Sequence, residues 1–335
     1  MQIRTALAGA AAAACLGLAS ARPPSAAAAA LGAPGASPCA IDGVERIVAV
    51  GDVHGAYEQF VQILKVAGLI DDRLHWSGGR THLVQTGDVV DRGPDSRKAI
   101  DLLRQLIDEA PKAGGAVHAL LGNHEAMRML GDMRYVNAGE YQAFVTPKSE
   151  AMRRQYVLQA PDERPLAETP LGLVEMRTAF GRDGDYGKWL RSLDAVMRIN
   201  GVLFMHGSLS LKTAGRSCAE MNDKIRRELG RDLDRTRANP QASLAAGEDG
   251  PLWYRGMNTI AETDVEQILA RAGARAIVVG HTVTQTTRIN VRFGKVFSID
   301  TGMQPQYVPT GHASALEIVG DVFTALYTDG RQVLR

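Results

Sequence analysis

Short apolar runs that end in glycine and polar residues recur along the first third of the chain. They occupy 47–50, 81–85 and 116–121, and the sequences that follow them are GDVHG, TGD and GNHE. Continuous apolar runs of this length are typical of strands buried on both faces. The pattern therefore predicts three strands, each with polar side chains directly after its carboxyl end.

Apolar residues at helical spacing follow each of these runs. They predict helices over 57–69, from Pro94 onward, and over 127–130. Repeated units of strand, polar loop and helix are typical of open α/β sheets, which place their sites at the carboxyl ends of the strands. We therefore expect the three polar loops to meet at one edge of a sheet.

The segment 137–198 breaks this rhythm, because it is highly charged and carries little strand pattern. Apolar spacing near 140–144, 150–157 and 186–193 predicts a helical insertion over the site. Its residues do not distinguish a mobile lid from a supporting subdomain. Both interpretations of the insertion are therefore kept.

Two more apolar runs, at 202–205 and 276–279, predict strands that end in His206-Gly-Ser and Gly-His281-Thr. Helices are expected over 219–237 and 262–272. The alternating stretches 284–291, 295–299 and 313–327 indicate a second, mostly antiparallel sheet. The predicted fold class is α/β, with two mixed β-sheets packed as a sandwich and flanked by helices, in one domain that spans 41–335.

The amino terminus has the pattern of an export signal. Arg4 precedes an alanine-rich apolar run that ends in Ala-Ser-Ala21, which predicts a signal peptide over 1–21 and a periplasmic or secreted protein. The run is too short and too glycine-interrupted for a membrane-spanning helix. Lipidation at Cys15 is the less favoured alternative, and residues 22–40 are expected to form a flexible tether.

The charge composition limits which partners the molecule attracts through its overall field. The 38 basic and 37 acidic residues give a net charge of +1, so no field of the whole molecule attracts nucleic acid or an anionic membrane. A nucleic-acid phosphodiesterase is disfavoured because no basic and aromatic stripe is present. After signal cleavage Cys39 and Cys218 remain, and they form either one disulfide or two unpaired thiols.

Six residues after the predicted strands are candidate metal ligands. A mixed oxygen and imidazole set of this size exceeds what one ion takes from a protein, and it fits two ions that share one carboxylate, for which Asp88 is the candidate. Manganese, iron or zinc suits such ligands better than calcium. The candidates are Asp52, His54, Asp88, Asn123, His206 and His281.

Four further residues are candidates for handling a phosphate ester. Arg92 and Arg255 are planar, bidentate groups that can hold phosphate oxygens. His124 can protonate a leaving oxygen while Asp91 orients its ring. Taken alone, the stretch from Asp88 to Arg92 also fits a polar loop in which Asp91 and Arg92 pair on the surface.

The combination of motifs resembles the calcineurin-like metallophosphoesterases, and most of all the phosphoprotein phosphatases. The similarity spans about Arg46 to Met303, and the helical insertion is similar to that of the bacterial Shewanella-like protein phosphatases. The motifs are GDVHG at 51–55, GDVVDRG at 87–93, GNHE at 122–125, HGS at 206–208, YRG at 254–256 and GHT at 280–282.

This resemblance implies a metal-dependent phosphomonoesterase that acts on phosphotyrosine or phosphoserine and phosphothreonine in proteins. A hydroxide bridging the two ions would attack phosphorus in line, with His124 as the acid, Asp91 as its partner, and Arg92 and Arg255 as phosphate binders. The implied ligands are Asp52, His54 and Asp88 for the first ion, and Asp88, Asn123, His206 and His281 for the second.

Two departures and two alternatives accompany the resemblance. Ser208 replaces the second glycine of the family's HGG motif, and the stretch 298–302 differs from the eukaryotic serine/threonine phosphatases, which leaves the phosphotyrosine preference open. A dinucleoside polyphosphate hydrolase usually lacks the equivalent of Asp91 and carries Asp in place of Glu125. A secreted pseudoenzyme that only binds phosphoproteins would be favoured by a missing ligand, and none is missing.

Overall fold

The structure, a computed structural model, describes residues 39–159 and 165–334. The predicted signal peptide, Cys15 and the tether up to residue 38 lie outside the described residues. Within the described part of the chain, none of the helices has the length and apolarity that a membrane span requires.

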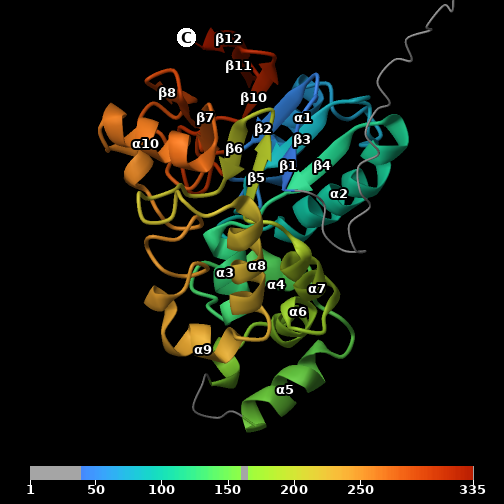
Figure 1. Cartoon of the computed structure of the whole chain (residues 1–335). Coiled ribbons are helices and arrows are strands. Elements are labelled where there is room, and N and C mark those ends of the chain that lie inside the picture. The colour runs from blue at the N-terminus through green and yellow to red at the C-terminus, as the bar shows by residue number, and fades with distance from the viewer. Residues whose placement is uncertain (1–38, 160–164, 335) are drawn as a thin grey trace, which may run out of the picture. The chain divides into compact units, whose positions relative to one another are not determined.

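The first sheet carries the three strands predicted from the first third of the chain (Figure 1). They are parallel, and Val50, Gln85 and Ala119 pair across them, so the three strands end at the same level. The sheet order is β12 (Gly330–Leu334), β11 (Val322–Tyr327), β10 (Ser314–Val319), β2 (Ile47–Val50), β3 (His82–Gln85) and β4 (Ala116–Ala119).

The second sheet repeats this arrangement with three parallel strands, β6, β7 and β9. Met205 pairs with Val279, which pairs with Ser298, so these strands also end level. The sheet order is β1 (Ala40–Ile41), β5 (Val196–Ile199), β6 (Val202–Met205), β7 (Ala276–Val279), β9 (Val296–Ser298) and β8 (Asn290–Arg292).

The two-sheet sandwich is confirmed, but the assignment of the last strands to one separate sheet is wrong. β8 and β9 join β7, whereas β10, β11 and β12 extend the first sheet through antiparallel pairing of β10 with β2. Alternation along a sequence indicates a strand without naming its partner. Here the partner is set by packing, because Leu316 and Ile318 of β10 share the inter-sheet core with Ile47 and Ala49 of β2.

Both faces of the central strands are buried. Val84, Phe204 and Val278 point into the core between the sheets. Alternate residues such as Leu83 and Ile277 pack outward with the apolar faces of the helices α1 (Tyr57–Val66), α2 (Ser96–Glu109) and α10 (Glu262–Ala272). This double burial explains why the strands appear in the sequence as continuous apolar runs.

The remaining helices gather on one side of the sandwich (Figure 1). Four of them fall in the segment predicted as a helical insertion, although its last residues belong to β5. Helix α6 was not predicted, and α3 begins at Asn123, earlier than expected. The helices are α3 (Asn123–Leu130), α4 (Ala138–Gln142), α5 (Ser149–Gln159), α6 (Leu173–Phe180), α7 (Asp185–Ser192), α8 (Cys218–Leu229) and α9 (Leu233–Ala238).

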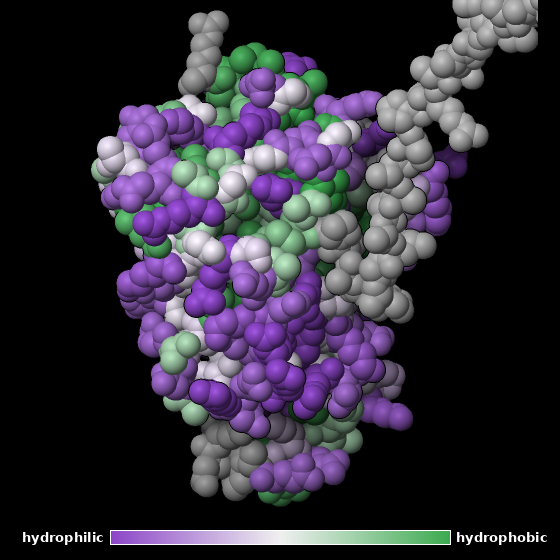
Figure 2. Space-filling view, viewed as in Figure 1, coloured by the Kyte–Doolittle hydropathy of each residue, from purple (hydrophilic) through white to green (hydrophobic). Residues whose placement is uncertain are grey.

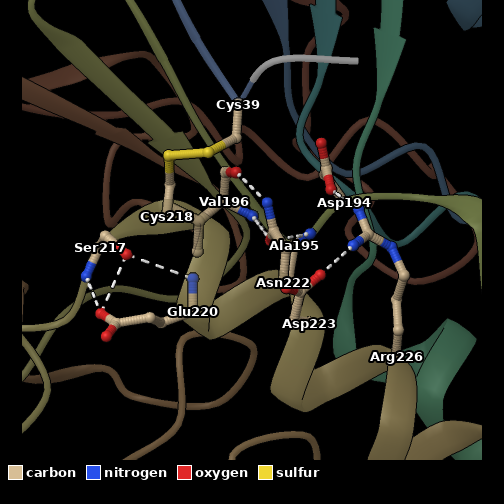
Figure 3. Close-up of a disulfide and its surroundings, with 10 residues drawn as sticks. All are labelled: Cys39, Asp194, Ala195, Val196, Ser217, Cys218, Glu220, Asn222, Asp223 and Arg226. Atoms are coloured by element: carbon tan, nitrogen blue, oxygen red, sulfur yellow. Dashed lines mark hydrogen bonds and ion pairs between the residues drawn. A yellow bond between two sulfur atoms is a disulfide. The ribbon is translucent and has the colours of Figure 1, made fainter. Parts of the chain in front are cut away.

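A disulfide joins Cys39 to Cys218, with their Cα atoms 6.0 Å apart (Figure 3). It ties the residue before β1 to the first residue of α8, so the end of the expected tether is part of the fold. Asn222 of α8 adds a second link to β5, because its side chain accepts hydrogen bonds from the backbone N–H groups of Ala195 and Val196 and donates to the Val196 carbonyl.

We predict that loss of this disulfide lowers the free energy of unfolding by about 2–4 kcal/mol, because the bridge restricts the unfolded chain across a separation of 179 residues. Urea unfolding of the chain with and without a thiol reductant measures the change. The double variant C39S/C218S should be insensitive to the reductant. An unchanged unfolding midpoint for the reduced wild-type chain would contradict the prediction.

Candidate active site

The six predicted metal ligands meet at the carboxyl ends of five parallel strands. Asp52 and His54 follow β2, Asp88 follows β3, and Asn123 follows β4 in the first sheet. From the second sheet, His206 follows β6 and His281 follows β7. Because the strands of each sheet end level, these side chains form one buried cluster where the two sheets meet.

Asp88 occupies the centre of this cluster. Its Oδ2 lies 3.5 Å from Nε2 of His54 and 3.2 Å from Nε2 of His206. On the far side, Nε2 of His206 lies 2.8 Å from Oδ1 of Asn123 and 3.0 Å from Nδ1 of His281. Asp88 therefore lies between the two groups of predicted ligands.

Backbone carbonyls fix the tautomer of each predicted ligand histidine. A carbonyl only accepts hydrogen bonds, so the ring nitrogen that faces it carries a proton, and in the neutral ring the other nitrogen presents a lone pair to the cluster. The donors are Nδ1 of His54 to Val90 (2.9 Å), Nδ1 of His206 to Thr86 (3.1 Å) and Nε2 of His281 to Trp253 (3.0 Å).

The residues present fit a metal centre. Nδ1 of His281 and Oδ1 of Asn123, two acceptors that carry no proton, both lie within 3.0 Å of Nε2 of His206. Burial, then the neighbouring His206, lowers the pKa of His281 to about 2, so that this imidazole stays neutral. Converging lone pairs repel one another unless a cation lies between them, and nitrogen and oxygen donors of this kind suit transition metals.

Buried carboxylates also crowd the site. Burial, then the charges of Asp300 and Asp88, raises the pKa of Asp52 well above its ordinary value. Burial likewise raises the pKa of Asp300 to about 6. Asp300 was not predicted as a site residue. It follows the parallel strand β9, so the same strand-end rule could have found it.

Five site residues have a backbone conformation that residues other than glycine rarely adopt. Of the nine such residues with positive φ in the described part of the chain, these five lie at the cluster, which indicates that the fold holds strain at this place. They are His54 (48°), Asp88 (55°), Asp91 (70°), Arg92 (67°) and His281 (66°).

The buried carboxylate of Glu125 holds the Asp88 loop in this conformation. It accepts hydrogen bonds of 2.8 Å from the backbone N–H groups of Asp88, Val89 and Gly122. Gly122 must be glycine here, since a Cβ atom would lie 2.2 Å from Oδ1 of Asp88. Glu125 was not predicted as a functional residue, because the sequence does not show which N–H groups lie beside it.

His124 and Asp91 form the predicted pair. Nδ1 of His124 donates to Asp91 at 2.7 Å, and Asp91 also accepts from Arg128, which pairs with Glu140 at 3.0 Å. Burial lowers the pKa of His124, but Asp88 and Asp91 outweigh it and raise that pKa above its usual value. The alternative of a surface pair between Asp91 and Arg92 is wrong, because Asp91 is fully buried.

Both predicted phosphate binders line a cavity of about 160 Å³ together with the ligand cluster. The guanidinium of Arg92 lies between the rings of Tyr135 and Tyr307, at 4.0 and 4.4 Å from their centroids. Arg255 is held by the carbonyl oxygen of His281. The two tyrosines were not predicted, because only the folded chain brings residues 135 and 307 to the same arginine.

A buried cluster of candidate metal-coordinating nitrogen and oxygen atoms, with two arginines lining the same cavity, is typical of a phosphoesterase site. Residues 45–285 match the family described as calcineurin-like phosphoesterase, and the chain belongs to this family. It is a metal-dependent phosphatase with a candidate dinuclear centre.

Its relatives within the family confirm the resemblance to the Shewanella-like protein phosphatases. Shewanella-like protein phosphatase 2 of Arabidopsis thaliana is 28% identical, in an alignment that covers 77% of this chain and 71% of that protein. An uncharacterized protein of Schizosaccharomyces pombe is 30% identical, in an alignment that covers 81% of this chain and 76% of that protein. The crystal structure of a cold-active protein-tyrosine phosphatase of a psychrophilic Shewanella species has a TM-score of 0.71 at 30% identity, covering 89% and 83%.

We predict that Glu125→Gln lowers the free energy of unfolding of the metal-free chain by about 1–3 kcal/mol, because an amide replaces a charged acceptor of several buried N–H groups. Urea unfolding in the presence of a chelator measures the change. The matched control is Glu248→Gln at an exposed position, which should change stability by less than about 0.5 kcal/mol. Equal stability of the two variants would refute the role assigned to Glu125.

Proposed function

We propose that the chain hydrolyses phosphate monoesters of proteins with two metal ions bound at the Asp88 cluster. The observation that carries this proposal is the convergence of Nε2 of His206, Nδ1 of His281 and Oδ1 of Asn123 beside Asp88. The proposed ligands are Asp52, His54 and Asp88 for one ion, and Asp88, Asn123, His206 and His281 for the other. Manganese, iron and zinc suit this donor set.

Metal ions at this site would activate a water nucleophile and neutralise charge on the phosphoryl group. Arg92 and Arg255 would orient the substrate through its phosphate oxygens, since both line the cavity. His124 would protonate the leaving oxygen. Asp91 would keep its ring in place through the hydrogen bond to Nδ1, which leaves Nε2 directed toward the cluster.

We also propose that phosphotyrosine is among the substrates. The rings of Tyr135 and Tyr307 flank Arg92 at the mouth of the cavity, and they are 36% and 45% exposed. Exposed ring faces beside the phosphate binder offer contacts to an aromatic side chain of a substrate. The similarity to the protein-tyrosine phosphatase of the psychrophilic Shewanella species also supports phosphotyrosine as a substrate.

Neither alternative class is favoured by a specific observation. A pseudoenzyme that only binds phosphoproteins does not need a buried histidine with an aligned carboxylate, such as His124 with Asp91. A dinucleoside polyphosphate hydrolase differs from a protein phosphatase in its substrate, so activity on a dinucleoside polyphosphate separates the two classes.

We predict that the mature chain hydrolyses p-nitrophenyl phosphate only after manganese or a similar ion is added, and that Asp88→Asn abolishes this activity. The control Asp321→Asn, which alters an exposed carboxylate, should keep wild-type activity. The same assay with phosphotyrosine, phosphoserine and phosphothreonine peptides and diadenosine tetraphosphate tests the substrate class. Full activity of the Asp88 variant would disprove the shared ligand, and a preference for diadenosine tetraphosphate would overturn the protein substrate.

A second prediction concerns His124. His124→Asn should lower kcat by about 100- to 10,000-fold for a phosphoserine peptide, whose alkoxide leaving group needs a proton. The loss should be much smaller for p-nitrophenyl phosphate, because nitrophenolate leaves without protonation. Metal content, measured in the same samples, serves as the control for an intact centre. An equal loss with both substrates would contradict the role of His124 as the acid.

A further inference from the structure

A second cavity, of about 460 Å³, lies among the helices α3, α6, α7 and α9 and the residues next to them. We call it the arginine cavity, because no carboxylate is present among the described residues that line it, whereas five arginines are. They are Arg128, Arg177, Arg182, Arg191 and Arg237. Figure 2 shows that hydrophilic residues gather over the helical half of the molecule on the face it presents.

Arg128 lacks acceptors on part of its guanidinium. Its Nη2 pairs with Asp91 and Glu140, but Nη1 reaches only the sulfur of Met176 at 3.5 Å, and the buried Nε has no partner within the described structure. A buried N–H group without an oxygen acceptor is costly. This side chain is 1% exposed and lines the cavity, so it points to an anion that the cavity would hold.

Three of the other arginines have no buried carboxylate partner among the described residues. Arg182 is exposed and has no ion pair with any described residue. Arg191 donates only to backbone carbonyls, and the partner of Arg237 is Asp234, a 97% exposed carboxylate at 3.3 Å. Burial, then the charges of Arg182 and Arg237, lowers the pKa of Arg191, and the charge of Asp183 offsets only part of this shift. The cations thus repel one another, and an anion among them would relieve this repulsion.

We propose that the arginine cavity is a binding site for a phosphate group, separate from the catalytic cavity. Arginine binds phosphate oxygens in planar, bidentate fashion, and several arginines around one cavity favour a ligand with more than one negative charge. The volume lies in the range of ordinary ligand sites, which is enough for a phosphorylated side chain.

The position of the cavity indicates what carries this phosphate. Arg128 binds Asp91, which holds His124, so the arginine cavity lies directly behind the proposed acid. Met133 lines it, while Tyr135, two residues further, flanks Arg92 at the mouth of the catalytic cavity. The phosphate is therefore either a second phosphoryl group on the substrate or free inorganic phosphate, the reaction product. This choice rests on the proposed function.

The first arm of the test compares a phosphotyrosine peptide with the same peptide carrying a second phosphate at several spacings. We expect kcat/KM of the metal-loaded wild-type chain to be about tenfold higher for one doubly phosphorylated peptide. Arg182→Glu should abolish this preference without changing the rate on the single phosphate. Arg216→Glu, which makes the same charge change at an exposed arginine outside this cavity, should keep it.

The second arm counts bound inorganic phosphate by equilibrium dialysis of the metal-loaded chain. If free phosphate is the ligand, the wild type and Arg216→Glu bind one phosphate more than Arg182→Glu. Equal phosphate counts in all three chains, together with no preference for any doubly phosphorylated peptide, would overturn the proposal. A chain without any phosphatase activity would disprove the proposed function, and dialysis alone would then decide on the arginine cavity.

Discussion

The site gathers carboxylates and other metal-coordinating groups where water hardly reaches them, and this arrangement costs desolvation and repulsion energy. Asp52, Asp88 and Asp300 lie together with little access to water, and three histidines direct ring nitrogens at the same small volume. Such an arrangement is unfavourable by itself, since each charge loses its hydration and each lone pair faces another. Bound cations would convert these repulsions into attractions, so the fold and the metal centre depend on one another.

The surrounding structure holds these groups in place by hydrogen bonds that the ligands themselves do not supply. Carbonyls of the loops fix the histidine tautomers, and Glu125 gathers N–H groups from the Asp88 loop and the start of α3. Without these bonds, the positive φ of Asp88 would relax toward a common conformation. The two sheets support this conformation, because the parallel strands of each sheet end together and place both halves of the site at one edge.

The parts of this site that could be predicted from the sequence are those that follow strands. Asp52, Asp88 and His206 each stand after an apolar run, and parallel strands bring their carboxyl ends together. Partners that depend on packing could not be predicted in this way. Glu140 reaches Arg128 from a helix of the insertion, and β10 pairs with β2 across most of the chain, so neither contact has a local pattern.

Arg128 gives the helical insertion a chemical part in the site beyond covering it. Its charge is divided between Glu140 in α4 and Asp91 beside the cluster, and the ring of Phe180 in α6 packs over its guanidinium at 4.8 Å. Burial lowers the pKa of Arg128, but Glu140 and Asp91 outweigh it and raise that pKa above its ordinary value, so the group stays a cation. An anion in the arginine cavity would interact with the same Arg128 guanidinium that forms the ion pair with Asp91. Because Asp91 in turn orients His124, occupancy of that cavity and the position of the acid are linked through one buried guanidinium.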